Sequence, residues 1–89
     1  MRTTLRVLLI EDSSERAETM RGHLRAAGFE PDMRYVSSEQ ALREALSESQ
    51  WDIVISSYRM PGMSALAALR VVQDSVRDLP FIVFSGTED

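Results

Sequence analysis

Residues 51–64, WDIVISSYRMPGMS, run from an apolar segment into a Pro-Gly turn. The segment DIVIS (52–56) is mostly branched and apolar, which is typical of a strand buried on both faces of a sheet. Two hydroxyl side chains, Ser56 and Ser57, stand where this strand should end. Open α/β sheets bind their ligands at the carboxyl ends of the strands, so Ser57 lies where functional residues are expected.

The residues before this stretch predict two strands and two helices. LRVLLI (5–10) reads as a buried strand, and the amphipathic stretch 14–27, followed by Gly28, reads as a helix. A weaker strand is expected at 33–36, at a sheet edge because Pro31 precedes it. Ser37 and Gln40 resemble a capping box for a second helix that ends near Ser49. Its apolar stripe consists of Ala41, Leu42, Ala45 and Leu46.

The residues after it predict a third helix and a fourth strand. Ser64 is the expected N-cap of a helix that runs to about Asp74, with Leu66, Leu69 and Val72 on its apolar face. FIVFS (81–85) then forms a strand opened by Pro80. The order β-α-β-α-β-α-β, with strands that are continuously hydrophobic, predicts a doubly wound parallel sheet of class α/β.

The strand order follows from the handedness of the connections. Right-handed crossovers, with the first helix on one face and the next two on the other, give the order 2-1-3-4. The reversal of strand order then lies between the first and third strands, where ligands bind in such sheets. Glu11 and Asp12 are therefore expected to face Ser57 across this crevice.

Composition limits the classes of protein to which the chain can belong. Its 89 residues fit one domain spanning residues 1–89, and neither a membrane span nor a signal peptide is visible, so a cytoplasmic location is expected. The chain has no cysteine, which excludes disulfides and thiol chemistry. A formal charge of -4, with ten dispersed arginines and no lysine, argues against nucleic acid as a partner. No membrane partner is expected either, because no apolar run is long enough for a span.

Two interpretations of the acidic pair remain open. Adjacent carboxylates at a strand end suit Mg²⁺, which takes hard oxygen ligands and few protein carboxylates. Alternatively, Glu11-Asp12-Ser13-Ser14 is a loop that caps the first helix, with acidic residues favoured by the helix dipole. Serine hydrolysis at Ser57 is disfavoured, because the single histidine, His23, falls at the surface of the first helix among mostly polar neighbours.

Taken together, VLLIEDS, DIVISSYRMPGM and PFIVFSG resemble the receiver domain of two-component response regulators from about residue 5 to residue 86. The resemblance implies a flavodoxin-like fold, CheY-like, with strand order 2-1-3-4-5. It implies Mg²⁺ ligands at Glu11, Asp12 and the backbone carbonyl of Arg59, and a phosphoryl contact at Ser85. The family's phosphoacceptor aspartate corresponds to Ser57, and the partner it implies is a histidine kinase or phosphotransfer protein.

Serine at position 57 changes the chemistry that the resemblance implies. A receiver forms an acyl phosphate on a carboxylate, whereas serine is neutral at pH 7 and needs a base to react. Ordinary phosphorylation is therefore expected to fail, and Mg²⁺ binding is expected to weaken because one carboxylate is lost. Removal of that carboxylate should also relieve repulsion and stabilise the metal-free fold.

The chain ends at Asp89, before the last strand and helices that the resemblance implies. One sheet face would then be bare, and Ile53, Ile55, Phe81 and Val83, or their alternates, would meet water. We expect self-association, or a partner, to cover this face.

Three functions are compatible with these features. The first is a pseudo-receiver that does not accept phosphoryl, is not an enzyme, and acts through protein-protein interaction. The second is a Mg²⁺-dependent phosphotransfer module with Ser57 as acceptor, or a sequence whose parent carries aspartate at position 57. The third is a truncated scaffold with no function of its own.

Overall fold

The computed structural model describes residues 3–57, 63–75 and 78–84. The expected alternation of strands and helices is confirmed over these ranges. The elements are β1 (Thr3–Ile10), α1 (Ser14–Ala26), β2 (Phe29–Val36), α2 (Glu39–Glu48), β3 (Ile53–Ser57), α3 (Ala65–Ser75) and β4 (Phe81–Phe84).

The four strands form one parallel sheet in the order β2-β1-β3-β4, as the crossover argument predicts. β1 is central and pairs with β2 on one side and β3 on the other. Its pairing with β2 continues one residue past the strand, because the main-chain N–H of Glu11 donates to the carbonyl of Val36 at 2.9 Å. The change of strand order therefore falls between β1 and β3, as expected.

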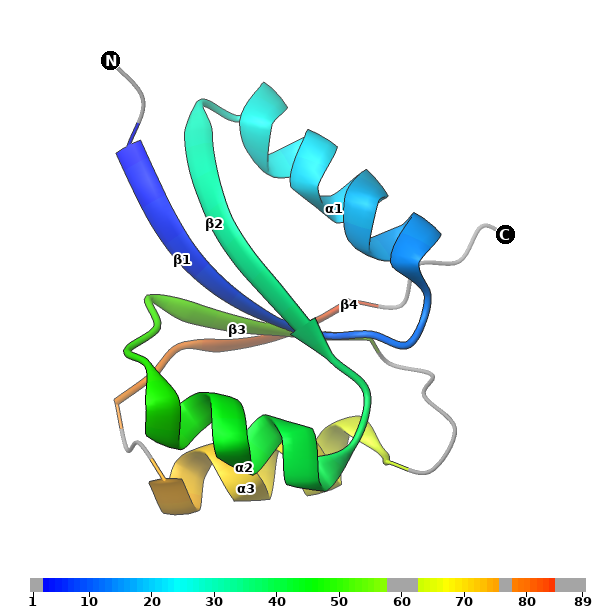
Figure 1. The fold of residues 1–89 in the computed structure, drawn as a ribbon, viewed down its shortest axis with the longest axis vertical. Coiled ribbons are helices and arrows are strands. Elements are labelled where there is room, and N and C mark those ends of the chain that lie inside the picture. Colours follow the sequence, from blue (N-terminus) through cyan, green and yellow to red (C-terminus); the bar gives the residue numbers. More distant parts are fainter. Residues whose placement is uncertain (1–2, 58–62, 76–77, 85–89) are drawn as a thin grey trace.

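Helices cover both faces of the sheet (Figure 1). α1 lies on one face, over Val7, Leu9 and Ile55, which form a core cluster with Ala17. α2 and α3 lie on the other face, where a larger cluster contains Leu8, Ile10, Val36, Leu42, Ala45, Leu46, Val54, Met63, Ala68, Val71 and Val72. Alternate residues of β1 point to opposite faces, which explains why its apolar run is continuous.

β2 is longer than the expected strand at 33–36 and includes Pro31. Its place at the sheet edge is confirmed. An edge strand tolerates a proline because only one side of the strand has to supply donors to a neighbour. The short apolar alternation in the sequence therefore underestimated the length of a strand in which the alternate residues Glu30, Asp32 and Arg34 are exposed.

The helix ends follow simple capping chemistry, with one correction. The Ser13 side chain accepts from the N–H of Arg16 and caps α1, and Gly28 follows the helix with a φ of 99°. The capping box expected at Ser37 and Gln40 is wrong: Ser38 is the N-cap of α2, and its hydroxyl accepts from Ala41 N–H at 3.1 Å. Ser38, one position later, caps the helix in the same way, but it accepts from the N–H of Ala41 and not from that of Gln40.

The start of α3 is confirmed, but its expected apolar face is only partly correct. The Ser64 hydroxyl accepts from Ala67 N–H at 3.1 Å, as an N-cap does. The buried residues are Ala68, Val71 and Val72, whereas Leu66 is 58% exposed. Leu66 lies two residues before Ala68, about 200° around the helix, so it faces away from the sheet when Ala68 packs.

The expected bare sheet face is wrong for most of the residues named. Ile55 is buried beneath α1, and Ile53 and Phe81 are half-buried against opposite core clusters. Exposure is instead concentrated on β4, where Ile82 is 49% exposed and Val83 is 44% exposed.

None of the helices in the described ranges has the length and apolar character that a membrane span requires.

Candidate functional site

The register of the sheet places Glu11 and Ser57 beside one another. Ile10 of β1 is paired with Ser56 of β3, and Glu11 and Ser57 are the next residues of these two parallel strands. Both lie at the carboxyl end of the sheet, at the change of strand order. The expected crevice between the acidic pair and Ser57 is therefore consistent with the pairing of the strands.

Glu11 is completely buried, and one of its two carboxylate oxygens is fully engaged. Oε2 accepts from the N–H groups of Asp12 and Ser13, both at 3.1 Å, and from Arg16 Nε at 3.0 Å. The other oxygen, Oε1, is buried and accepts no hydrogen bond from the residues described. Such an atom is costly to bury unless a cation or another donor reaches it.

Arg16 joins both members of the acidic pair. Besides its bond to Glu11, its Nη2 lies 3.8 Å from Asp12 Oδ1. The hydrogen bond and the charge of Glu11 raise the pKa of Arg16, with a smaller contribution from Asp12, so the guanidinium remains charged. Arg16 is not among the predicted site residues, although Asp12 and Arg16 have the i,i+4 spacing of a helical ion pair.

The acidic pair has a donor set that fits a hard divalent cation. Asp12 has a side chain that is 36% exposed, and Glu11 offers the unengaged Oε1. Within the described ranges, no group of three or more histidine, cysteine or acidic side chains gathers in a metal-binding arrangement. A cation here would thus have two carboxylates and several waters, which Mg²⁺ accepts.

Both interpretations of residues 11–14 have support in the structure. Ser13 caps α1, and Glu15 lies in the first turn, as the capping interpretation requires. Glu11 nevertheless keeps one oxygen without a protein donor among the described residues, which capping alone does not explain. Ser85 and Arg59, the other two predicted site residues, lie outside the described residues.

Ser57 is the last residue of β3 and is only 5% exposed. Its neighbour Ser56 is a buried strand residue whose hydroxyl donates to the carbonyl of Ser57 at 3.2 Å. The single histidine, His23, is exposed on α1, seven residues or about 10 Å along the helix from Arg16. The position of His23, exposed and about two helical turns beyond Arg16, gives no support to a histidine base for Ser57.

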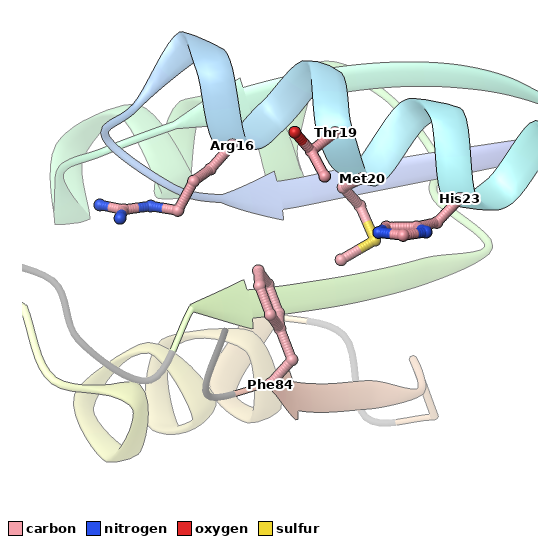
Figure 2. Close-up of a pocket in the computed structure, with 5 residues that line it drawn as sticks. All are labelled: Arg16, Thr19, Met20, His23 and Phe84. Carbon is pink, nitrogen blue, oxygen red and sulfur yellow. The ribbon is translucent and has the colours of Figure 1, made fainter. Parts of the chain in front are cut away.

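A pocket of about 240 Å³ lies between α1 and β4. Among the described residues, none in β1 or β3 lines it. Arg16, Thr19, Met20 and His23 line it from the helix, and Phe84 lines it from the strand (Figure 2). The Phe84 ring points toward α1, whereas the Arg16 guanidinium extends away from His23. Arg16 thus reaches from the rim of this pocket to the acidic pair.

A family model described as the response regulator receiver domain matches residues 7–89. The chain belongs to this family. Receiver domains are signalling modules of two-component systems, so this receiver domain is a component of two-component signal transduction. The resemblance of the motifs to the family is confirmed.

A named relative agrees with this assignment. The receiver domain is 40% identical over 86 residues to the C4-dicarboxylate transport transcriptional regulatory protein DctD of Rhizobium meliloti (strain 1021), covering 93% of this chain and 18% of that regulator. It thus spans less than a fifth of the length of that relative.

Solved structures share the fold. The receiver domain of sensor histidine kinase PA1611 from Pseudomonas aeruginosa PAO1 has a TM-score of 0.76 at 18% identity, over 96% of this chain and 70% of that one, and holds a magnesium ion in its active-site cleft. The complex of histidine kinase ThkA with response regulator protein TrrA contains a match with a TM-score of 0.74 at 21% identity, over 100% of this chain and 72% of that one. At these identities the likeness shows the CheY-like fold.

Proposed function

We propose that residues 1–89 form a receiver domain that binds partners of a phosphorelay without accepting a phosphoryl group at Ser57. The observation that carries this proposal is the position of Ser57, which ends β3 directly beside the buried Glu11. A hydroxyl at this strand end supplies neither the negative charge nor the ready nucleophile that a carboxylate supplies.

The surroundings of Ser57 support the absence of phosphoryl transfer. Glu11, the neighbouring carboxylate, is held by two main-chain N–H groups and by Arg16. His23 is an exposed residue of α1 at the Phe84 pocket. A serine hydroxyl reacts only when a base removes its proton. The one unengaged carboxylate oxygen beside Ser57 among the described residues is Glu11 Oε1, which this proposal assigns to Mg²⁺ and not to the role of a base.

Glu11 and Asp12 are the residues that would hold Mg²⁺ in this proposal. Glu11 would contribute Oε1, because Oε2 already accepts three hydrogen bonds. A bound Mg²⁺ would neutralise the negative charge of a phosphoryl-bearing partner. The magnesium in the related PA1611 receiver supports this assignment, and the presence of two carboxylates supports weak binding.

The partner class that fits best is a histidine kinase or a phosphotransfer protein. The ThkA complex, in which a related response regulator is bound to a kinase, supports this class. Because a receiver can dock without reacting, loss of the acceptor leaves binding as the function. The protein would thus act as a scaffold, or as a competitor for the partner, in a phosphorelay and not as an enzyme.

Intact mass measurement tests the proposal directly. The protein is incubated with acetyl phosphate and Mg²⁺ and weighed, and no increase in mass is expected. Ser57→Asp should gain one phosphate that is lost in mild base, as an acyl phosphate is. Ser57→Asn, which is similar in shape to aspartate but uncharged, should gain none.

Two outcomes would contradict this proposal. A base-stable adduct of one phosphate on the unaltered protein, absent from Ser57→Ala, would assign phosphotransfer with Ser57 as acceptor. Failure of Ser57→Asp to react, despite correct folding by circular dichroism, would show that position 57 is not the acceptor position.

Self-association stays a prediction. β4 carries the exposed Ile82 and Val83, and within the described ranges it pairs only with β3. An apolar edge strand can pair with a second copy of itself. Sedimentation velocity at micromolar concentration should show a dimer that Ile82→Lys converts to monomer; a folded monomer of the unaltered protein would contradict the prediction.

A further inference from the structure

Arg16 contacts the acidic pair in a way that the family assignment does not require. Its Nε donates to Glu11 Oε2 at 3.0 Å, and its Nη2 lies 3.8 Å from Asp12 Oδ1. One guanidinium therefore faces both carboxylates that would hold a cation. The pair and the arginine together carry a net charge of -1 instead of the -2 of the carboxylates alone.

The Glu11 contact differs from other ion pairs of the chain. In the pairs Arg43–Glu39 and Arg34–Glu48, every side chain is at least 42% exposed. The Glu11 side chain is instead fully buried, while Arg16 itself is 57% exposed. Water screens the first kind of pair strongly and the second kind much less.

The backbone holds Arg16 near the pair but leaves its guanidinium able to move. The main-chain N–H of Arg16 donates to Ser13 Oγ at 3.2 Å, which fixes the first turn of α1 just beyond the carboxylates. The long side chain reaches back from this turn and remains half exposed. It can therefore rotate into solvent when another cation takes its place.

A divalent cation at the pair would meet the charge of Arg16 at short range. Glu11 keeps Oε1 without a donor among the described residues, so a cation can reach that oxygen while Oε2 stays bound to main-chain N–H groups. At Asp12, by contrast, the cation and Arg16 would compete for the same carboxylate. Repulsion between a divalent ion and a guanidinium a few ångströms apart opposes binding.

We propose that Arg16 is a built-in counter-cation of the Glu11–Asp12 pair, and that a divalent cation binds by releasing Arg16 from Asp12. This inference rests on the proposed metal site at the acidic pair. Arg16 neutralises part of the acidic charge while no metal is bound, and it lowers the affinity of the site for Mg²⁺. Metal binding then frees a positively charged side chain at the start of α1 and at the rim of the Phe84 pocket.

Metal titration of charge variants tests the inference. Free Mn²⁺ is followed by its electron paramagnetic resonance signal in the unaltered protein and in Arg16→Met, and Mg²⁺ is used as competitor. Arg16→Met should bind Mn²⁺ about three- to tenfold more tightly, because one repelling charge has been removed. Arg16→Lys, which keeps the charge, should bind nearly as the unaltered protein does.

Arg43→Met is the matched control, since it removes an arginine that pairs with Glu39 far along the sequence from the acidic pair. Its Mn²⁺ affinity should not change. Thermal unfolding gives a second measurement: Mn²⁺ should raise the midpoint of Arg16→Met more than that of the unaltered protein. Circular dichroism establishes that each variant folds.

The possible results are distinguishable. Equal or weaker Mn²⁺ binding by Arg16→Met would overturn the inference and assign Arg16 the role of holding Glu11 in place. Absence of Mn²⁺ binding by all the proteins would overturn both the metal site and the inference. The phosphorylation test at Ser57 is independent of either result.

Discussion

The Ser38 hydroxyl accepts a hydrogen bond from the main-chain N–H of Ala41 at 3.1 Å, at the start of α2. The first N–H groups of a helix have no partner within the helix, and a serine at the N-cap satisfies one of them. The adjacent serine, Ser37, precedes this position and is not the cap.

Ser38→Ala should therefore lower the free energy of unfolding by about 1 kcal/mol, because it removes the capping oxygen. Ser37→Ala is the control and should change stability by less than about 0.5 kcal/mol. Urea denaturation followed by circular dichroism measures both. Equal losses in the two variants would mean that both serines contribute to the helix start.

Gly28 and Gly22 should respond in opposite ways to alanine. Gly28 has a φ of 99°, a conformation that alanine rarely adopts, although no atom lies within 4 Å of the added methyl group. Gly28→Ala should cost about 1–2 kcal/mol of stability through backbone strain alone. Gly22 lies inside α1 with open space around it, so Gly22→Ala should stabilise by about 0.5–1 kcal/mol. Thermal unfolding of the two variants compares them; a stabilising Gly28→Ala would contradict the assigned backbone conformation.

Leu42 and Leu66 compare a buried leucine with an exposed one. Leu42 of α2 has no exposed surface and packs in the larger core cluster between the helices and the sheet. Leu66 of α3 is instead 58% exposed. Leu42→Ala should cost about 2–5 kcal/mol, because it leaves a cavity. Leu66→Ala should change stability by about 0.5 kcal/mol or less. Similar losses at the two positions in urea titrations would show that Leu66 is packed against another part of the protein.

Ser57→Asp should destabilise the metal-free protein and strengthen metal binding. A carboxylate added beside Glu11 repels the acidic pair, which should lower stability by about 1–2 kcal/mol in EDTA. Mg²⁺ should recover that loss, because it gains a third carboxylate ligand. Ser57→Asn has a side chain of nearly the same shape as aspartate but without the charge. Comparing the stabilities of the two variants therefore separates the effect of charge repulsion from that of packing. A Ser57→Asp protein as stable in EDTA as with Mg²⁺ would contradict the proximity of residue 57 to the pair.

Strand order and the helices on each face could be predicted from the sequence. Continuous apolar runs identify buried parallel strands, and the handedness of crossovers leaves few arrangements for three connections. The apolar stripe at Leu42, Ala45 and Leu46 was also correct, because four apolar residues at helical spacing leave one possible face.

Other features depend on packing that local sequence does not determine. Alanine and leucine occur all around α3. Its contacts with the sheet and with α2, and not its apolar periodicity, therefore decide which of its residues are buried. The cap of α2 could fall on either of two consecutive serines, and the structure selects the second.

The candidate site shows the same division. Glu11, Asp12 and Ser57 could be placed at neighbouring strand ends from topology alone. The contact between Arg16 and the buried Glu11 could not, because it requires the docking of α1 and the burial of a carboxylate, a residue type that is rarely buried. Ser85 and the Arg59 carbonyl stay predictions.

The two outer strands of the described sheet, β2 and β4, differ in character: one is charged and the other is apolar. β2 has a proline, Pro31, and the exposed charges of Glu30, Asp32 and Arg34, features that resist the addition of another strand. β4 presents Ile82 and Val83 instead. Copies that associate through β4 alone form a closed pair about a two-fold axis, whereas an open fibre would need β4 of one copy to join β2 of the next. In the proposed self-association, the charged, proline-containing edge would therefore limit strand pairing to a finite assembly.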